Sequence, residues 1–218
     1  MPLFDICFNF TSSKFRNNEE DYLKRAYDAD VSHLLVTGSD QEDSRFAIEL
    51  AHRYQNNMYA TVGVHPHLAK NWQQDTLKTL RHLAGNDRVK AIGEAGLDYN
   101  RNFSTHDQQA LAFRQQIELA ISLQKPLFLH ERDAHDEFFS ILKEYRNDIG
   151  PTVVHCFTGD ARALENYLSM DLYVGITGWI CDERRGSHLH ELVKIIPRER
   201  LLIETDAPYL FPRTYRPR

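Results

Sequence analysis

The feature that most limits how this chain can fold is a regular alternation between short apolar runs and stretches with helical periodicity. Eight runs rich in β-branched and aromatic residues recur along the sequence, each with the length of a buried strand. We therefore predict strands at residues 4–8, 33–37, 59–64, 89–92, 126–129, 152–154, 172–176 and 201–203. Helices are predicted between most of them, at residues 19–29, 43–54, 75–83, 105–123, 134–145 and 161–168.

This alternation is typical of an α/β protein, and it fits either a closed (β/α)8 barrel or an open doubly wound sheet. A doubly wound nucleotide fold carries a glycine-rich turn after an early strand, and neither G-x-G-x-x-G nor a P-loop occurs in the sequence. Polar residues instead follow the ends of many predicted strands, as in a TIM barrel. At 218 residues the chain is long enough for one sizeable core. We predict a single barrel domain over residues 1–218.

Charge and cysteine usage limit the partners and the location of the protein. A net charge of −5 argues against a broad basic surface that coats duplex DNA, although an enzyme that grips a few phosphates needs only local cations. The three cysteines are an odd number without a C-x-x-C pair, which indicates a reducing compartment. No segment approaches the roughly 18 apolar residues of a membrane span or resembles an export signal. We expect a cytoplasmic protein without a membrane partner.

Polar residues gather at the predicted carboxyl ends of the strands, and a closed barrel brings these ends to one mouth. Imidazole and carboxylate groups from separate strands can then surround one cation, and this donor set suits Zn²⁺, Mn²⁺ or, with more oxygen ligands, Mg²⁺. Water bound to such a cation becomes a nucleophile near neutral pH. The strand-end residues are Asn9, His65, His67, Glu94, Asp98, His130, His155 and Asp206.

Each of these residues also has an ordinary structural interpretation. A lone histidine such as His130 more often makes a hydrogen bond than binds a metal. Asp206 can cap a turn. Glu94 is harder to explain in this way, because it lies on a strand expected to be buried, where an unpaired carboxylate costs several kcal/mol. A bound cation would remove that cost.

Other residues of the predicted mouth loops fit a phosphorylated substrate that carries bases. His65 can donate a hydrogen bond or a proton to a phosphate. Guanidinium groups can grip phosphate oxygens in a forked geometry, although solvated surface charges give the same sequence pattern. The candidate phosphate-binding residues are Arg101, Arg132, Arg184 and Arg185. The candidate rings for stacking on nucleobases, with a structural role as the alternative, are Trp179, Tyr99, Phe157, Tyr209 and Phe211.

At five places the sequence resembles the TatD family of metal-dependent hydrolases. The matching segments read GVHPH at 63–67, AIGEAGLD at 91–98, LHERDA at 129–134, HCFTG at 155–159 and IETDAPY at 203–209. Two more segments, NRNFST at 100–105 and ITGWICDERRG at 176–186, are similar to the bacterial TatD branch in particular. The resemblance covers almost the entire chain.

The resemblance implies a barrel of the metal-dependent hydrolase type that acts as a nuclease on DNA. It implies removal of nucleotides from 3′ ends in DNA repair or turnover, with single strands and RNA as further substrates. It also implies Mg²⁺ as the cofactor, with Mn²⁺ or Zn²⁺ as alternatives, and a monomer that binds the ends of single-stranded DNA. By motif, the metal ligands are Glu94, His130 and His155, the catalytic acidic residue is Asp206, and the substrate-contacting histidine is His65.

Two departures from the family pattern lead to further expectations. Many members carry Asp-x-His-x-His on the first strand, where this chain has Asp5, Cys7 and Asn9, so two imidazole ligands of a second metal are absent. We expect one tightly bound cation per chain. Family members also continue well beyond the loop that holds Pro212 and Arg213, so we expect a C-terminally truncated chain whose barrel has no eighth helix.

Two other functions stay open on the sequence. The same ligands on the same barrel serve carbonyl hydrolysis, so a small-molecule amidohydrolase or lactonase is the first alternative. The second is a non-catalytic metal-binding scaffold, because the first-strand histidines are absent. The arginines of the predicted mouth favour a phosphorylated substrate over both.

Overall fold

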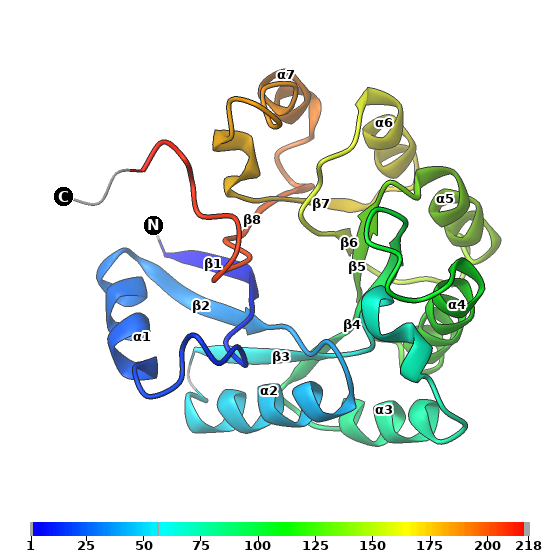
Figure 1. The fold of residues 1–218 in the computed structure, drawn as a ribbon, viewed down its shortest axis with the longest axis horizontal. Helices are drawn as coiled ribbons and strands as arrows, with labels where there is room; N and C mark the ends of the chain where they lie inside the picture. The colour runs from blue at the N-terminus through cyan, green and yellow to red at the C-terminus, as the bar shows by residue number, and fades with distance from the viewer. Residues whose placement is uncertain (1, 56, 216–218) are drawn as a thin grey trace.

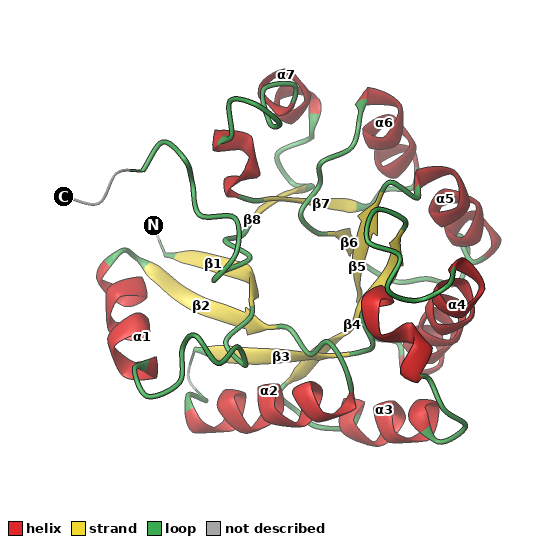
Figure 2. Cartoon of the chain, in the orientation of Figure 1, coloured by secondary structure: helices red, strands yellow, loops and turns green. Residues whose placement is uncertain are grey.

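The structure, a computed structural model, describes residues 2–55 and 57–215. Its centre is one sheet of eight parallel strands that follow one another in chain order, with the helices outside the ring of strands (Figures 1 and 2). The predicted TIM barrel is thereby confirmed. The strands are β1 (Leu3–Phe8), β2 (Val31–Val36), β3 (Met58–Val62), β4 (Val89–Asp98), β5 (Leu127–Arg132), β6 (Thr152–Val154), β7 (Tyr173–Ile176) and β8 (Leu201–Ile203).

The ring of strands is nearly closed between β1 and β8. Seven neighbouring pairs are joined by parallel ladders. The first and last strands instead meet through an isolated bridge between Phe8, the last residue of β1, and Ala207, beyond the end of β8. The backbone N–H of Asn9 donates to the carbonyl of Ala207 at 2.9 Å, and that of Asp206 donates to the carbonyl of Cys7 at 2.9 Å. The seam between β1 and β8 therefore depends on a few contacts at the mouth.

The predicted helices are all present, with ends within a few residues of those expected. Thr105 begins the longest one, because its side chain and that of Gln108 cap each other's backbone N–H groups. Short helices at the mouth, η1 and those after β7, were not predicted. The helices are α1 (Glu19–Asp28), α2 (Gln41–Arg53), η1 (Pro66–Asn71), α3 (Thr76–Ala84), α4 (His106–Leu123), α5 (His135–Glu144), α6 (Ala161–Ser169), η2 (Gly178–Cys181), α7 (Leu189–Leu192) and η3 (Val193–Ile195).

The outer face of β8 has no helix of its own among the residues described up to Tyr215. The side chain of Ile203 is consequently 50% exposed, although it belongs to a barrel strand. This agrees with the expected absence of an eighth helix from this chain. Within residues 2–55 and 57–215, no helix combines the length and the apolar character needed to cross a bilayer.

The strand β4 is six residues longer than the predicted strand that ended at Ile92, so its predicted end was wrong. Gly93 and Gly96 are strand breakers on sequence alone, but here they have φ values of 135° and 144° inside the strand. A Cβ at either position would overlap a carbonyl oxygen of β5, that of Phe128 or that of His130. The two glycines therefore let β4 continue against β5 with a shifted register, and they place Glu94 inside the strand.

Two apolar layers hold the barrel together. The larger one fills the space between the outside of the sheet and the helices, with fully buried rings such as Phe113 and Phe138. The smaller one lies inside the barrel below the mouth and includes Ile6, Cys7 and Phe128. Below it, an apolar cavity of about 350 Å³ opens among side chains at the amino ends of the strands. The polar residues of the mouth thus lie above an apolar layer inside the barrel.

Asp5 ties β1 to the segment after β8. One of its carboxylate oxygens accepts hydrogen bonds from the N–H of Thr205 at 2.9 Å and of Cys7 at 3.2 Å, and the other accepts from the Thr205 hydroxyl at 2.6 Å. The side chain is buried, and desolvation raises its pKa to about 6 in spite of these hydrogen bonds. The carboxylate at the seam is therefore held in its charged form at neutral pH at a cost in stability.

We predict that this cost has a defined pH dependence. Because the folded-state pKa is above the unfolded value of 3.8, the stability contributed by Asp5 is greatest below that value and falls as the pH rises through about 6. The Asp5→Asn variant keeps an acceptor oxygen without a charge. The free energy of unfolding of the variant minus that of the wild type should therefore increase by roughly 2–3 kcal/mol as the pH rises from about 4 to about 7.

Denaturation by guanidinium chloride at a series of pH values measures this difference. The exposed Asp87 supplies the matched control variant, Asp87→Asn, since its side chain is 77% exposed. A stability difference between Asp5→Asn and the wild type that stays constant across the pH range would contradict the prediction.

Candidate metal centre

The buried carboxylate of Glu94 is the centre of the polar cluster at the mouth. Its Oε1 atom lies 2.8 Å from His155 Nε2, 3.3 Å from His130 Nδ1 and 3.4 Å from His65 Nε2. These three histidines come from the ends of three other strands, β3, β5 and β6. The structure thus brings together the three residues predicted as metal ligands, Glu94, His130 and His155, with His65 beside them.

The pKa values of Glu94 and of the histidines around it depend on one another. Burial alone favours a neutral carboxyl, yet the surrounding imidazoles hold the pKa of Glu94 well below its usual range. Burial also opposes the charged form of His155, but the carboxylates of Glu204 and Glu94 raise its pKa well above the usual value. His65 behaves differently, because burial outweighs the attraction of Glu94 and lowers its pKa to about 4.

The donor atoms fit a divalent cation. Ligand atoms of His65, Glu94 and His130 all lie within 4.8 Å of one another, and His155 reaches Glu94 directly. The Nδ1 atom of His155 and the Oε2 atom of Glu204 are buried without a hydrogen-bond partner among the described residues, 3.5 Å apart. Imidazole nitrogen and carboxylate oxygen together suit Zn²⁺ or Mn²⁺ and accept Mg²⁺ when water completes the set.

Two buried carboxylates behind the histidines were not assigned a role from the sequence. Asp98 is 2% exposed, and its Oδ2 lies 3.2 Å from His130 Nε2 and 2.8 Å from His67 Nε2. Glu204 faces the Nδ1 atom of His155 and accepts a hydrogen bond from the N–H of Cys156. In each predicted ligand histidine, one ring nitrogen therefore faces a carboxylate, Asp98 or Glu204. The other ring nitrogen, Nδ1 of His130 and Nε2 of His155, faces Glu94.

A signal for both carboxylates was present in the sequence. Asp98 ends the AIGEAGLD segment and Glu204 lies two residues before Asp206, so both belong to segments already singled out. Asp98 was overlooked as a partner of His130 because β4 was expected to end before Glu94. Pairing between β4 and β5 sets Gly96 against His130 and Asp98 against Arg132, which brings the Asp98 carboxylate to the histidine.

Asp206 lies on the other side of the cluster, on the seam. Its Oδ1 accepts a hydrogen bond from Asn9 Nδ2 at 2.8 Å, and the Sγ atom of Cys7 lies 3.5 Å away. Desolvation, partly opposed by His155, raises the pKa of Asp206 to about 6. The Asn9 carbonyl oxygen accepts from the Thr37 hydroxyl at 3.1 Å, so both ends of this amide are already hydrogen-bonded. Burial and nearby carboxylates raise the pKa of the Cys7 thiol well above its usual range.

His65, which was predicted to contact the substrate, lies beside Glu94 in the cluster. Its Nδ1 atom accepts the N–H of His67 at 3.1 Å, which requires the proton of the neutral ring to lie on Nε2. That N–H is directed toward Glu94 Oε1, 3.4 Å away. Pro66 between the two histidines is the first residue of η1, and this fixes the backbone that carries His65.

The predicted phosphate-binding and stacking residues lie on the loops around the mouth and differ in what they already bind. Arg132 and Arg185 have their guanidinium carbons 5.3 Å and 4.1 Å from the centre of the Trp179 ring. Arg184 forms an ion pair with Asp182 at 3.2 Å, whereas Arg101 is exposed on the loop after β4.

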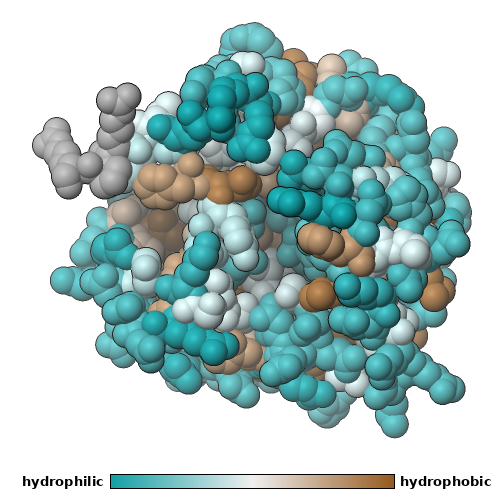
Figure 3. Space-filling model, viewed as in Figure 1, coloured by the Kyte–Doolittle hydropathy of each residue, from teal (hydrophilic) through white to brown (hydrophobic). Residues whose placement is uncertain are grey.

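Among the rings predicted to be able to stack on bases, Phe157 is only 2% exposed and belongs to the core. Its assignment to the open mouth was wrong, because the loop after β6 folds its ring inward against Tyr167. Tyr209 and Phe211 are 54% and 63% exposed and agree with the expected loop position. The space-filling view shows a hydrophilic face around a central depression, with apolar groups at separate places on its rim (Figure 3).

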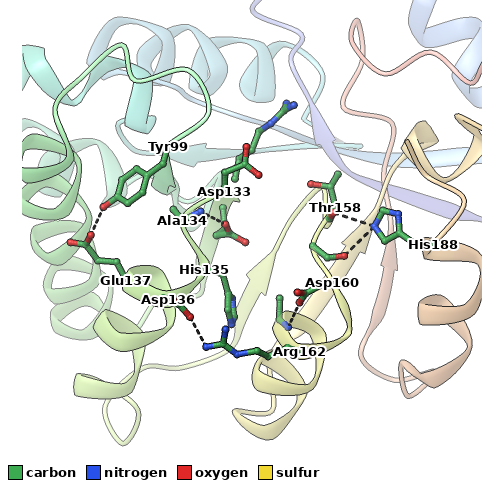
Figure 4. Close-up of a pocket in the computed structure, with 14 residues that line it drawn as sticks. Tyr99, Asp133, Ala134, His135, Asp136, Glu137, Thr158, Asp160, Arg162 and His188 are labelled. Carbon is green, nitrogen blue, oxygen red and sulfur yellow. Dashed lines mark hydrogen bonds and ion pairs between the residues drawn. The ribbon is translucent and has the colours of Figure 1, made fainter. Parts of the chain in front are cut away.

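A groove of about 650 Å³ lies between the loops after β4, β5 and β6. Figure 4 shows Tyr99 reaching Glu137 on one wall and His188 reaching the loop at Thr158 on the other. More carboxylates than guanidinium groups line it. Those carboxylates cap helices or pair with neighbours, as Asp160 does at the start of α6. Apart from Arg132 and Arg162, the charged groups of this groove are therefore acidic.

A TIM barrel whose strand ends converge on one buried carboxylate and several imidazoles defines a metal-dependent hydrolase. Residues 4–218 match the family described as TatD related DNase, and the chain belongs to this family. The resemblance seen in the sequence is thereby confirmed.

Known relatives agree with this assignment. The chain is 51% identical over 216 residues to the 3′-5′ ssDNA/RNA exonuclease TatD of Pantoea sp. (strain At-9b), covering 99% of this chain and 83% of that protein. Among solved structures, the TatD homolog YJJV from Escherichia coli K12 has a TM-score of 0.86 at 30% identity and covers 95% of this chain and 80% of its own. A TatD family hydrolase from Entamoeba histolytica has a TM-score of 0.87 at 31% identity, covering 98% and 76%.

We predict that Asp98 and Glu204 set the affinity of the centre for metal. Replacing a carboxylate that orients a ligand histidine typically weakens metal binding about 10- to 100-fold. Asp98→Asn and Glu204→Gln should each show a loss of this size in equilibrium dialysis against Mn²⁺, with a native circular dichroism spectrum. The control is Asp171→Asn, a carboxylate that pairs with Arg200 at the amino ends of β7 and β8, opposite the mouth. Variants that bind Mn²⁺ as tightly as the wild type would show that neither carboxylate orients a ligand.

Proposed function

We propose that this protein is a divalent-metal nuclease that removes nucleotides from the 3′ ends of single-stranded DNA and RNA. The observation that carries the proposal is the convergence of His65, His130 and His155 on one oxygen of a buried glutamate. Relatives about half identical in sequence are named as 3′-5′ ssDNA/RNA exonucleases, which supports the same substrate class. The three free cysteines fit a reducing cytoplasm, and Mg²⁺ is the proposed ion.

Each residue of the centre has a role in this proposal. Glu94, His130 and His155 hold the cation, which supplies Lewis acidity to a phosphate oxygen and acidifies a water when it is bound. Asp206 orients the attacking water and accepts its proton. His65 donates its Nε2 hydrogen bond to the phosphate, and this stabilises the charge that develops there.

The mouth arginines distinguish a phosphodiesterase from the two alternatives. We propose that Arg132 and Arg101 contact phosphate oxygens of the bound strand, and that Trp179 and Arg184 border its path. An amidohydrolase or lactonase acting on a neutral carbonyl compound has no need of such cations. A non-catalytic metal-binding scaffold would need the histidines to hold the ion, but it would need neither these arginines nor Asp206 beside the centre.

The first test of the function replaces a ligand. Glu94→Ala or His130→Ala should reduce hydrolysis below roughly a tenth of the wild-type rate while the circular dichroism spectrum stays native, because a group at the barrel mouth contributes little to the core. The assay uses single DNA and RNA strands labelled at the 5′ or the 3′ end, incubated with Mg²⁺, Mn²⁺ or Zn²⁺ in turn.

Two companion substrates decide between the functions. The wild type should hydrolyse a nitrophenyl phosphodiester and leave a nitrophenyl ester intact. Hydrolysis of the ester alone would support the amidohydrolase, and inactivity toward all substrates would support the scaffold. Asp87→Ala, an exposed carboxylate variant, serves as the control with wild-type rates.

The second test concerns the number of metal ions. Since the Asn9 amide is hydrogen-bonded at both ends and the Cys7 thiol is held protonated, we expect one tightly bound ion per chain. Elemental analysis after gel filtration measures the ratio. Asp206→Asn should keep that ion and lose kcat. Two stoichiometric ions per chain without substrate would contradict the single site, and retained kcat would remove Asp206 from catalysis.

A further inference from the structure

The loop between β4 and α4 carries an exposed aromatic ring beside the metal centre. Phe103 is 54% exposed, and its ring centre lies 4.9 Å from that of His67 with the two planes at 87°. We propose that Phe103 stacks on an unpaired nucleobase next to the scissile phosphate, and thus binds the substrate. This inference rests on the proposed nuclease function and names a base-binding group for the same site.

The position of Phe103 follows from a short series of contacts. The ring of His67 lies 4.3 Å from that of His65, the proposed phosphate donor, and its Nε2 atom lies 2.8 Å from Asp98. The same Asp98 oxygen lies 3.2 Å from Nε2 of His130. Phe103 is therefore separated from the centre by a single ring, and a nucleotide whose phosphate reaches His65 has its base within reach of Phe103.

The loop that presents Phe103 is fixed on both sides of the ring. Before it, Asp98 accepts the N–H of Asn100 at 3.0 Å and that of Arg101 at 2.9 Å. After it, the buried Ser104 donates to the carbonyl of His67 at 3.1 Å and accepts the N–H of Lys70 at 3.0 Å. The loop is thus joined to η1 as well as to β4.

The buried amide of Gln109 completes this support from α4. Its Nε2 donates to the carbonyls of Asp98 at 3.1 Å and of Ser104 at 3.0 Å, and its Oε1 accepts the N–H of Asp98 at 2.8 Å. Asn102 donates to the carbonyl of Tyr99 at 2.7 Å, in a left-handed conformation with φ of 52°. A ring on so constrained a backbone loses little further freedom when a ligand binds.

Because its ring is exposed, Phe103 does not contribute the full stabilisation that burial of a phenylalanine would give. A single apolar side chain on a surface is ordinary, but burying a phenylalanine is worth about 1.5–3 kcal/mol. The perpendicular contact with His67 leaves at least one face of the Phe103 ring uncovered by the described rings. That face suits a flat partner of any base identity, because stacking does not require a hydrogen-bonding pattern.

The other exposed rings of the rim are less suited to this role. Arg132 and Arg185 both lie over the Trp179 ring, so this ring already has two guanidinium partners. Phe211 lies on the segment after β8 and contacts Tyr215, with no ring contact to the histidines of the centre. Tyr209 is bonded to Asp206 only through its backbone N–H, and Lys14 lies over its ring. Among the described residues, Phe103 is the exposed ring that makes a ring contact with a histidine beside the centre.

The experiment compares Phe103→Leu with the wild type on single-stranded DNA with all bases present or with one abasic nucleotide. Stacking on one base is worth about 1–3 kcal/mol, so KM of the variant on the complete strand should rise about 5- to 100-fold, with kcat little changed. An abasic residue at the terminal or the penultimate 3′ position should remove this difference between the two proteins. Phe103→Trp should restore a KM near that of the wild type.

The control is Phe4→Leu, which changes a ring that is 41% exposed at the opposite end of the barrel. Manganese content and melting temperature of each variant report on folding and on the centre. A wild-type KM for Phe103→Leu, or a rise that persists on both abasic strands, would overturn the stacking role while the nuclease function stands. A wild type that cleaves no strand would instead refute the proposed function, and the stacking role with it.

Discussion

The burial of one charged carboxylate is the constraint on which the rest of the structure depends. Glu94 sits inside a barrel strand, and such a group is tolerated only where opposite charge and hydrogen-bond donors surround it. Three imidazoles from three other strands supply them, and Asp98 and Glu204 hold two of these rings from behind. The fold satisfies this requirement by converging its strand ends, so the geometry of the barrel and the chemistry of the site have a common origin.

Sequence periodicity was enough to predict the number and order of the strands, because apolar runs and helical faces leave strong patterns. It failed at the end of β4. Gly93 and Gly96 interrupt an apolar run, and only the close approach of the carbonyls of β5 explains why the strand continues through them. Periodicity also could not predict η1, whose residues take their conformation from Pro66 and from contacts with α4 and β4.

Residue type and position at strand ends were enough to predict a polar cluster at the mouth, whereas the assignment of Glu94, His130 and His155 as metal ligands came from the resemblance to the family. Asp98 and Glu204 were missed because an orienting carboxylate is defined by the nitrogen it faces, and this depends on the register of β4 against β5 and on the packing of the segment after β8. Phe157 was misplaced for a related reason. A loop residue is predicted to be outside by default, and only packing against Tyr167 shows that this ring turns inward.

The seam between β1 and β8 has a consequence for how the molecule opens. It is joined by one isolated bridge, the hydrogen bonds of Asp5 and the amide of Asn9, whereas every other pair of neighbouring strands has a ladder. Regions with few backbone hydrogen bonds open locally well before the whole domain unfolds. Asp206 lies on this seam. A fluctuation that parts the first and last strands would move Asp206 relative to Glu94 and its histidines. Hydrogen exchange at the amides of Asn9 and Asp206 would report on this opening and, under the catalytic role proposed for Asp206, on the intervals in which the site is inactive.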